Sequence, residues 1–323
     1  NSELFKNKIV LDIGSGTGIL SFFAAQAGAK HVYGIEYADI ADYSLEIIKK
    51  NKMEDKITII KAKVEEAELP VDKVDIILSE WMGYFLLYES MLDCVLFARD
   101  KWLKKDGIMF PDRATMFLAG LEDKKYKHRK IDSWNNIFGF NMDCIKEVAI
   151  AEPLIDSCNE NYLISDTCKI FDIDLYKIKK EELDFMSGYQ IVFNEDECFN
   201  GLVAWFNVSF NKVKNKVVLP TGPLDETTHW KHEEQCAHKV LSKVAKALDA
   251  DDGDESLVSP RSLASYQDDL LEVMMADQKK EEDGSPMDVS NAGNSEQGDA
   301  DDERSQETPE ESFERKMVQT IQF

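Results

Sequence analysis

The sequence lacks several features that would place it in specialised classes of protein. Its 323 residues contain no run of 18 or more apolar residues, and the first residues, Asn1 to Lys8, are polar. A membrane-spanning helix and a secretory signal each need such an apolar stretch. We therefore expect a soluble, intracellular protein with no membrane partner.

Closely spaced cysteines are also missing. The chain has six cysteines and no C-x-x-C pair, so neither a zinc site nor a disulfide framework is supported. No metal is expected, and the thiols are interpreted as reduced. The cysteines are Cys94, Cys144, Cys158, Cys168, Cys198 and Cys236.

No basic stripe offsets the acidic residues, and the formal net charge is −24. Much of this charge lies between Asp249 and Phe323, which holds 22 acidic and 6 basic residues. Such a balance repels phosphate, so direct nucleic-acid binding is not expected, whereas a cationic protein would be attracted.

In the N-terminal third of the chain, short apolar runs alternate with segments of helical length, Ile19 to Ala27 and Ile40 to Asn51. Strands this apolar suit a parallel sheet that is covered on both faces. We predict a doubly wound α/β domain over residues 1–111. The four runs are Ile9 to Ile13, Val32 to Ile35, Ile57 to Ile60 and Val74 to Leu78.

After Pro111 the pattern changes to alternating stretches, which predicts an antiparallel β domain over residues 112–232 with a helical insertion near residues 124–158. The i+4 spacing of Val240, Val244 and Leu248 predicts an amphipathic helix over Glu233 to Leu248. The rest of residues 233–323 is rich in acidic and small polar residues, so it is expected to be mostly disordered.

A glycine-rich turn follows the first strand, in the order Asp12, Gly14, Gly16, Gly18. The spacing is G-x-G-x-G, and the aspartate precedes the first glycine. A carboxylate there would repel a dinucleotide pyrophosphate, but it could hold the ammonium of a methionine moiety while the turn amides bind its carboxylate. The turn therefore favours S-adenosyl-L-methionine as the cofactor.

Two further strand ends fit the same ligand. Glu36 ends the second strand, where a carboxylate can accept hydrogen bonds from both ribose hydroxyls, although sites for nicotinamide dinucleotides share this feature. Val64 and Glu65 follow the third strand and could contact adenine and its amino group. Polar residues at three successive strand ends indicate a binding site more strongly than any one of them does.

The fourth strand runs into an aromatic loop, SEWMGYFLLYESM, that is bracketed by Glu80 and Glu89. The loop is too apolar for an ordinary solvated loop. Two converging carboxylates in an aromatic-walled pocket could pair with both edges of a guanidinium, which is planar and carries five donors. This pattern predicts an arginine side chain as the acceptor.

With these motifs the sequence resembles the protein arginine N-methyltransferases, over about Leu4 to Lys231. The paired-glutamate loop is the most specific part of the resemblance, and Trp81 to Tyr84 with Met91 resembles the type I subgroup, which forms mono- and asymmetric dimethylarginine. The resemblance implies Rossmann-like and β-barrel domains, histones and Arg/Gly-rich segments of RNA-binding proteins as substrates, and a place in the nucleus and cytoplasm.

The resemblance also implies residue roles, which are transferred onto matching positions. The expected catalytic residues are Glu80, Glu89 and His229, and Tyr84 and Trp230 would wall the arginine slot. The helical arm at residues 124–158 would make a homodimer. The expected cofactor-binding residues are Asp12, Gly14, Gly16, Gly18, Glu36, Val64, Glu65 and Met91.

The sequence departs from the family at both ends. The two helices that precede the first strand in the family are expected to be absent, and after Lys231 the barrel is expected to be incomplete. Two alternatives therefore stay open: a catalytically impaired fragment or paralogue that acts as a dimerising scaffold, and a methyltransferase for an acceptor other than arginine.

Overall fold

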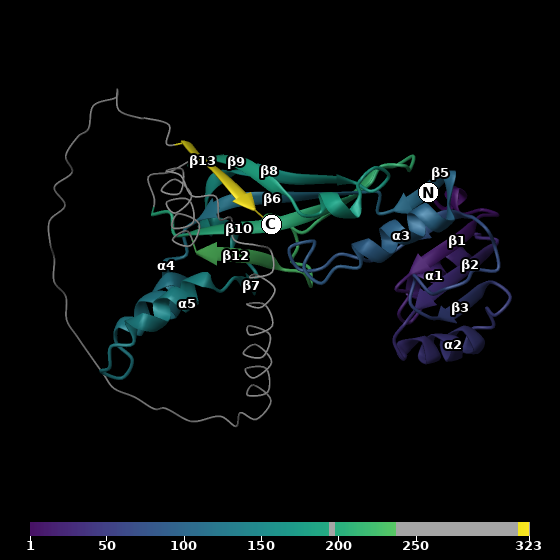
Figure 1. The fold of residues 1–323 in the computed structure, drawn as a ribbon, viewed down its shortest axis with the longest axis horizontal. Helices are drawn as coiled ribbons and strands as arrows, with labels where there is room; N and C mark the ends of the chain where they lie inside the picture. Colours follow the sequence, from purple (N-terminus) through teal and green to yellow (C-terminus); the bar gives the residue numbers. More distant parts are fainter. Residues whose placement is uncertain (194–197, 237–315, 323) are drawn as a thin grey trace. The chain divides into compact units, whose positions relative to one another are not determined.

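The computed structural model describes residues 1–193, 198–236 and 316–322, and these residues belong to one compact unit (Figure 1). The first part alternates strands and helices. Its elements are η1 (Ser2–Leu4), β1 (Ile9–Ile13), α1 (Ile19–Gln26), β2 (His31–Glu36), α2 (Ile40–Lys50), β3 (Ile57–Lys61), β4 (Val74–Leu78), α3 (Leu92–Trp102) and β5 (Leu103–Phe110).

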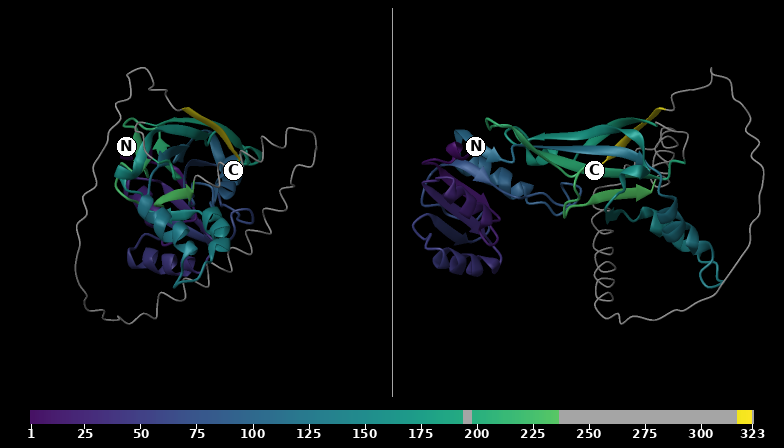
Figure 2. Two further views of the ribbon diagram at one scale, coloured as in Figure 1. Left: turned by 90° about the vertical axis from the view of Figure 1, so that its left-hand side faces the viewer. Right: turned by 180° about the vertical axis from the view of Figure 1, so that it is seen from behind.

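The five strands form a parallel sheet in the order β3-β2-β1-β4-β5. One face packs Val10 and Val32 against Ala24 of α1 and Ile48 of α2. The other face packs alternate strand residues against α3, where Leu92 is fully buried. Helices therefore cover both faces, and the predicted doubly wound α/β domain is confirmed (Figure 2).

A second set of strands follows Pro111 and is antiparallel. It forms a sheet in the order β7-β12-β10-β6-β8, with β11 paired to β10, and a two-stranded sheet of β9 and β13. This confirms the antiparallel β domain. The strands are β6 (Arg113–Leu121), β7 (Leu154–Asp156), β8 (Leu163–Asp174), β9 (Met186–Val192), β10 (Gly201–Phe210), β11 (Val217–Pro220), β12 (His232–Cys236) and β13 (Lys316–Gln322).

The predicted helical arm consists of several short pieces. Phe138 and Phe140, in the segment between two of these pieces, are 98% and 68% exposed. The pieces are α4 (Lys124–Tyr126), the π-helical η2 (Lys127–Ile131), η3 (Asp132–Asn135), η4 (Asp143–Ile145) and α5 (Lys146–Ala151), and two further 3-10 turns, η5 (Glu160–Tyr162) and η6 (Lys180–Glu182), flank β8.

Two predictions for the C-terminal part need correction. Residues 233–236, expected to begin a helix, belong to β12, because this segment pairs with β10 on one side and β7 on the other. Lys316–Gln322, expected to be disordered, forms β13 and pairs with β9. The remainder of the predicted helix and tail lies outside the described residues.

Candidate active site

In the glycine turn between β1 and α1, the three glycines adopt a left-handed backbone conformation. Gly14, Gly16 and Gly18 have φ angles of 67°, 55° and 88°, which side chains other than glycine rarely adopt. The amides of Gly14 and Ser15 both donate to the carbonyl of Ile35 on β2, at 2.9 and 3.2 Å. The turn therefore lies against the end of β2, as a nucleoside site at this sheet edge requires.

Asp12 lies behind this turn and is fully buried. Its Oδ2 accepts a hydrogen bond from the Ser21 hydroxyl of α1 at 2.7 Å, while Oδ1 has no hydrogen-bond partner. Burial raises the pKa of this carboxyl to about 6. Oδ1 is thus an acceptor that a cationic group could satisfy, but the observed contact links β1 to α1, and contact with a ligand ammonium stays a prediction.

Glu36 joins the turn to the end of β2. One carboxylate oxygen accepts from the amide of Gly16 and the other from the amide of Ala38, each at 2.9 Å. Each oxygen keeps a second lone pair for a hydroxyl donor. The predicted ribose acceptor is therefore held in place by backbone on both sides.

The residues after β3 lie near Cys94, which no sequence motif had indicated. Val64 is buried, Glu65 is exposed, and Cys94 of α3 lies close enough to Glu65 for the carboxylate to affect its thiol. Burial, with Glu65 as the second cause, raises the pKa of the Cys94 thiol to about 11. The thiol is therefore protonated and can act as a donor beside the predicted adenine subsite. Cys94 is far from Glu65 in the sequence, so no sequence motif indicated that the two residues are neighbours.

Met91 connects the glycine turn to the acceptor loop. A Cβ atom added at Gly14 would lie 2.5 Å from Cε of Met91, so the methionine side chain lies directly on the glycine. The amide of Met91 donates to the carbonyl of Trp81 at 2.9 Å. Met91 thus lies between the predicted cofactor and acceptor sites.

The acceptor loop folds back on itself. Gly83 and Leu86 form one antiparallel bridge, Tyr84 and Tyr88 form another, and the Met91 to Trp81 hydrogen bond closes the base. Trp81 and Leu86 are 1% and 0% exposed and anchor the loop in the core. The segments that carry Glu80 and Glu89 are therefore brought together at the base of the loop.

Glu80 and Glu89 have different surroundings. Burial raises the pKa of Glu80, and nearby His229 partly offsets the shift by favouring the charged form. Glu89 has a φ of 53°, an unusual value for a residue other than glycine, and its charge, after burial, helps to raise the pKa of the neighbouring Tyr88 hydroxyl. The sequence had identified both carboxylates, and the structure adds His229 and Tyr88 as their neighbours.

The loop that precedes β12 contributes Trp230 and His229. Trp230 is 8% exposed, and its Nε1 donates to the carbonyl of Met82 at 3.0 Å. Its ring also contacts the rings of Phe206 and His229. Trp230 thus fastens the antiparallel domain to the acceptor loop. Tyr84, the other predicted wall, is 41% exposed on the loop.

Within the described ranges, no helix is long and apolar enough to span a membrane. The same ranges hold no cluster of three His, Cys, Asp or Glu side chains that could bind a metal ion.

Comparison with known proteins relates both parts of the chain to methyltransferases. Residues 112–240 match the family model described as the arginine methyltransferase oligomerization subdomain. Residues 2–130 match the model described as ribosomal protein L11 methyltransferase. The two models therefore divide the chain near the change from the parallel to the antiparallel sheet.

Individual relatives are similar over most of the chain. Protein arginine N-methyltransferase 8-B of Danio rerio is 52% identical over 231 residues, which are 72% of this chain and 55% of that protein. Protein arginine N-methyltransferase 1 of Chlamydomonas reinhardtii is 53% identical over 231 residues, with 72% and 67% covered. The chain thus spans about half to two thirds of the length of these relatives.

A solved structure shows the same fold. The Trypanosoma brucei PRMT1 enzyme-prozyme heterotetrameric complex with AdoHcy aligns with a TM-score of 0.71 and 40% identity, and the alignment covers 73% of this chain and 74% of that chain.

Proposed function

Because this chain belongs to the protein arginine N-methyltransferase family, we propose that it transfers a methyl group from S-adenosyl-L-methionine to a guanidinium nitrogen of arginine side chains in proteins. The proposed products are mono- and asymmetric dimethylarginine, as in type I enzymes. The proposed substrates are Arg/Gly-rich segments and histones, whose positive charge suits an acidic protein with a net charge of −24.

The residues around the glycine turn fit this cofactor. Gly16 leaves space for the backbone to approach a ligand, since a Cβ atom there would meet nothing within 4 Å, and Glu36 is held at the end of β2 where it can accept from ribose hydroxyls. Glu65 and the Cys94 thiol offer an acceptor and a donor for the edge of adenine. When bound, the cofactor supplies an electrophilic methyl group on a sulfonium.

The acceptor loop would supply the rest of the chemistry. A guanidinium is a poor nucleophile because it is protonated and its charge is delocalised. Glu80 and Glu89, on the two sides of the loop base, would hold this charge on the nitrogens they contact and leave lone-pair density on the attacking nitrogen. The raised pKa of Glu80 favours it as an acceptor for the proton that is lost.

The single observation that carries the proposal is the closed acceptor loop. Its base hydrogen bond joins Trp81, which follows Glu80, to Met91, which lies two residues after Glu89 and contacts the glycine turn. A methyltransferase for a neutral small molecule would have no use for two charged groups there, since each costs desolvation without a cationic partner.

The test replaces the charge of one carboxylate and keeps its shape. We expect Glu89→Gln to lower the rate of radiolabelled methyl transfer to an Arg/Gly-rich peptide by about a hundredfold or more, because a preorganised charge at the reacting group is lost. Cofactor affinity, measured by calorimetry, should stay close to that of the wild type. Glu181→Gln, an exposed glutamate on η6, is the matched control and should be fully active.

Two results would contradict the assignment. Full activity of Glu89→Gln would remove the carboxylate from the mechanism. Loss of both transfer and cofactor binding would mean that Glu89 supports the fold of the site rather than the acceptor.

We also propose that the chain forms a homodimer through the arm at residues 124–158. The match to an oligomerization subdomain and the exposed Phe138 and Phe140 support this. The nucleus and cytoplasm remain the predicted locations.

A further inference from the structure

Two fully buried polar side chains, Asp12 of β1 and Ser21 of α1, meet behind the glycine turn. The Ser21 hydroxyl donates a hydrogen bond to Oδ2 of Asp12 at 2.7 Å. A carboxylate in such a place keeps its charge only where nearby donors stabilise it, because burial alone favours the neutral acid. The hydroxyl of Ser21 therefore affects both the position and the charge of Asp12.

The rest of the surroundings gives this carboxylate little support. Its Oδ1 has no hydrogen-bond partner among the described residues. The positions that pair with Asp12 in the sheet are Gly34 on β2 and Leu78 on β4, and neither has a polar side chain. Helix α1 has no charged residue in its sequence, ILSFFAAQ. Within the described ranges, Ser21 is thus the one side chain that donates to Asp12.

The charge of Asp12 depends on opposing effects. The pKa of this carboxyl is raised to about 6: burial is the largest cause, the hydrogen bond from Ser21 opposes it, and the charge of Glu36 adds to it. Of the charged groups described on the elements packed against Asp12, Glu36 of β2 is the one that acts on it. Asp12 is therefore charged above about pH 6, and loss of the serine hydroxyl would move this boundary to a higher pH.

We propose that Ser21 is a positioning residue for cofactor binding, whose hydroxyl keeps Asp12 charged and oriented so that the carboxylate attracts the ammonium of the cofactor's methionine moiety. The inference rests on the proposed function, since it needs that cofactor. Asp12 lies two residues before Gly14, and a buried charge acts strongly on a nearby ligand charge because its surroundings screen it little. The alternative is that the hydrogen bond only fastens α1 to β1.

The chain offers a matched control, Ser44 of α2. It is also a fully buried serine in a helix, and it also lies against the glycine turn, since a Cβ atom added at Gly18 would lie 2.9 Å from its Oγ. Its hydroxyl has no hydrogen-bond partner among the described residues. Ser21→Ala and Ser44→Ala therefore remove the same atom beside the same turn, but only Ser21→Ala removes a donor from Asp12.

The experiment measures, by calorimetry, the affinity of the full chain and its variants for S-adenosylhomocysteine between pH 5.5 and pH 7.5. We expect the affinity of the wild type to fall as the pH drops through about 6. Ser21→Ala should raise the midpoint by about one pH unit. Its affinity should then be about fivefold weaker than that of the wild type at pH 6, and within about twofold of it at pH 7.5. Ser44→Ala should keep the wild-type midpoint.

Two further measurements separate the ammonium from the rest of the site. The ligand 5′-methylthioadenosine has the same nucleoside and no ammonium, so all variants should bind it alike at each pH, which also shows that they are folded. Ser21→Cys keeps the size of the side chain and a weak donor, so its midpoint should rise less than that of Ser21→Ala. If Ser21→Ala does not fold, Ser21→Cys decides, because a purely structural role predicts no shift.

Several outcomes would overturn the proposal. If Ser21→Ala weakens S-adenosylhomocysteine equally at every pH, the serine has a structural role only. An equal shift in Ser44→Ala, or an equal shift for 5′-methylthioadenosine, would mean that the effect does not depend on the carboxylate and the ammonium. In these cases the proposed function stands, because the wild type binds the cofactor product. If the wild type binds neither ligand at any pH, the proposed function fails and the inference fails with it.

Discussion

Gly83 occupies a position in the acceptor loop that leaves no room for a side chain. A Cβ atom there would overlap the backbone carbonyl of Tyr88, which cannot move without opening the loop. The same backbone forms the bridges that bring Glu80 and Glu89 to the loop base. The glycine is thus required by close packing within the loop.

We therefore expect Gly83→Ala to lower methyl transfer at least tenfold and the free energy of unfolding by about 1–3 kcal/mol, as overpacking does. Activity assays and urea denaturation measure the two effects. Cofactor affinity should change little, because the glycine turn is held by its own hydrogen bonds to Ile35 and Glu36 of β2. A fully active Gly83→Ala would show that the loop tolerates a different backbone path.

Strand β12 carries a buried histidine whose protonation opposes folding. His232 is 3% exposed, and its Nδ1 accepts a hydrogen bond from the amide of Cys158 at 2.9 Å. Burial lowers the pKa of His232 below its usual value. The neutral ring is therefore the form that fits the folded protein, since a proton on Nδ1 would remove the acceptor from Cys158.

The sign of the pH dependence follows from this. The unfolded chain binds a proton at His232 near pH 6.5 while the folded chain does not, so stability is present above that pH and falls as the pH drops toward the lower folded pKa. We expect the wild type to lose up to about 1.4 kcal/mol per pH unit more than His232→Asn in this window. Denaturation curves measured between pH 7 and pH 5 give the free energy of unfolding of both proteins. If that free energy changes equally with pH in both, the prediction is wrong.

The elements differ in how well the sequence predicts them. The strands of the parallel sheet are continuous apolar runs, such as Val74–Leu78, because both faces are buried, and their positions were predicted closely. Strand β12 contains two glutamates and a glutamine, which favour helix, and only its pairing with β10 and β7 makes it a strand. Pairing between distant segments has no local signal.

The site shows the same limit. The glycines and glutamates could be predicted because each lies in a continuous motif at a strand end. The contacts of Ser21 with Asp12, and of Cys94 with Glu65, join different elements and depend on how these pack. Trp230 was predicted as a wall of the arginine slot, but its hydrogen bond to Met82 could be found only from the structure.

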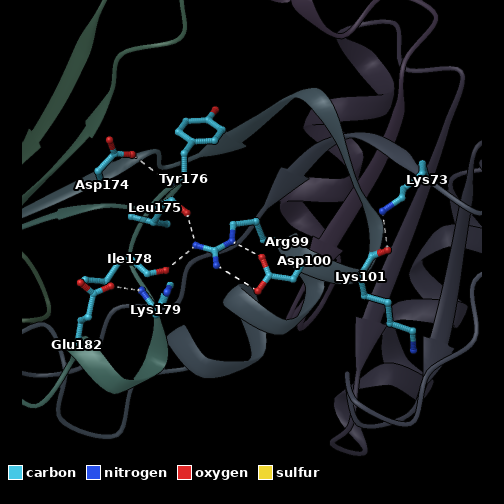
Figure 3. A network of polar contacts seen from close by, with 10 residues as sticks. All are labelled: Lys73, Arg99, Asp100, Lys101, Asp174, Leu175, Tyr176, Ile178, Lys179 and Glu182. Atoms are coloured by element: carbon cyan, nitrogen blue, oxygen red, sulfur yellow. Dashed lines mark hydrogen bonds and ion pairs between the residues drawn. The ribbon is translucent and has the colours of Figure 1, made fainter.

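At the scale of the whole molecule, the proposed active site uses residues from both sheets, so the contact between the two domains must be rigid. Arg99 of α3 contributes hydrogen bonds to this contact (Figure 3). Its Nη1 donates to the carbonyls of Leu175 and Ile178, which follow β8, each at 2.8 Å, and Asp100 pairs with the other side of the guanidinium. The Arg99 side chain is 12% exposed, so these bonds are shielded from water.

We expect Arg99→Met to lower the free energy of unfolding by about 2–4 kcal/mol, because two charge-assisted hydrogen bonds are lost and two carbonyls lose their donor. The control is Lys180→Met, which removes an ion pair between Lys180 of η6 and Asp93 of α3, the helix that also carries Arg99. The two side chains of this pair are 69% and 47% exposed. An exposed ion pair contributes little to stability because solvent screens it, so this variant should be close to wild type. Calorimetry measures the stability of both variants, and an activity assay measures their rates of methyl transfer. Stability and rate should both fall in Arg99→Met, and neither should fall in Lys180→Met. Equal effects of the two substitutions would mean that the domain contact does not depend on the buried arginine.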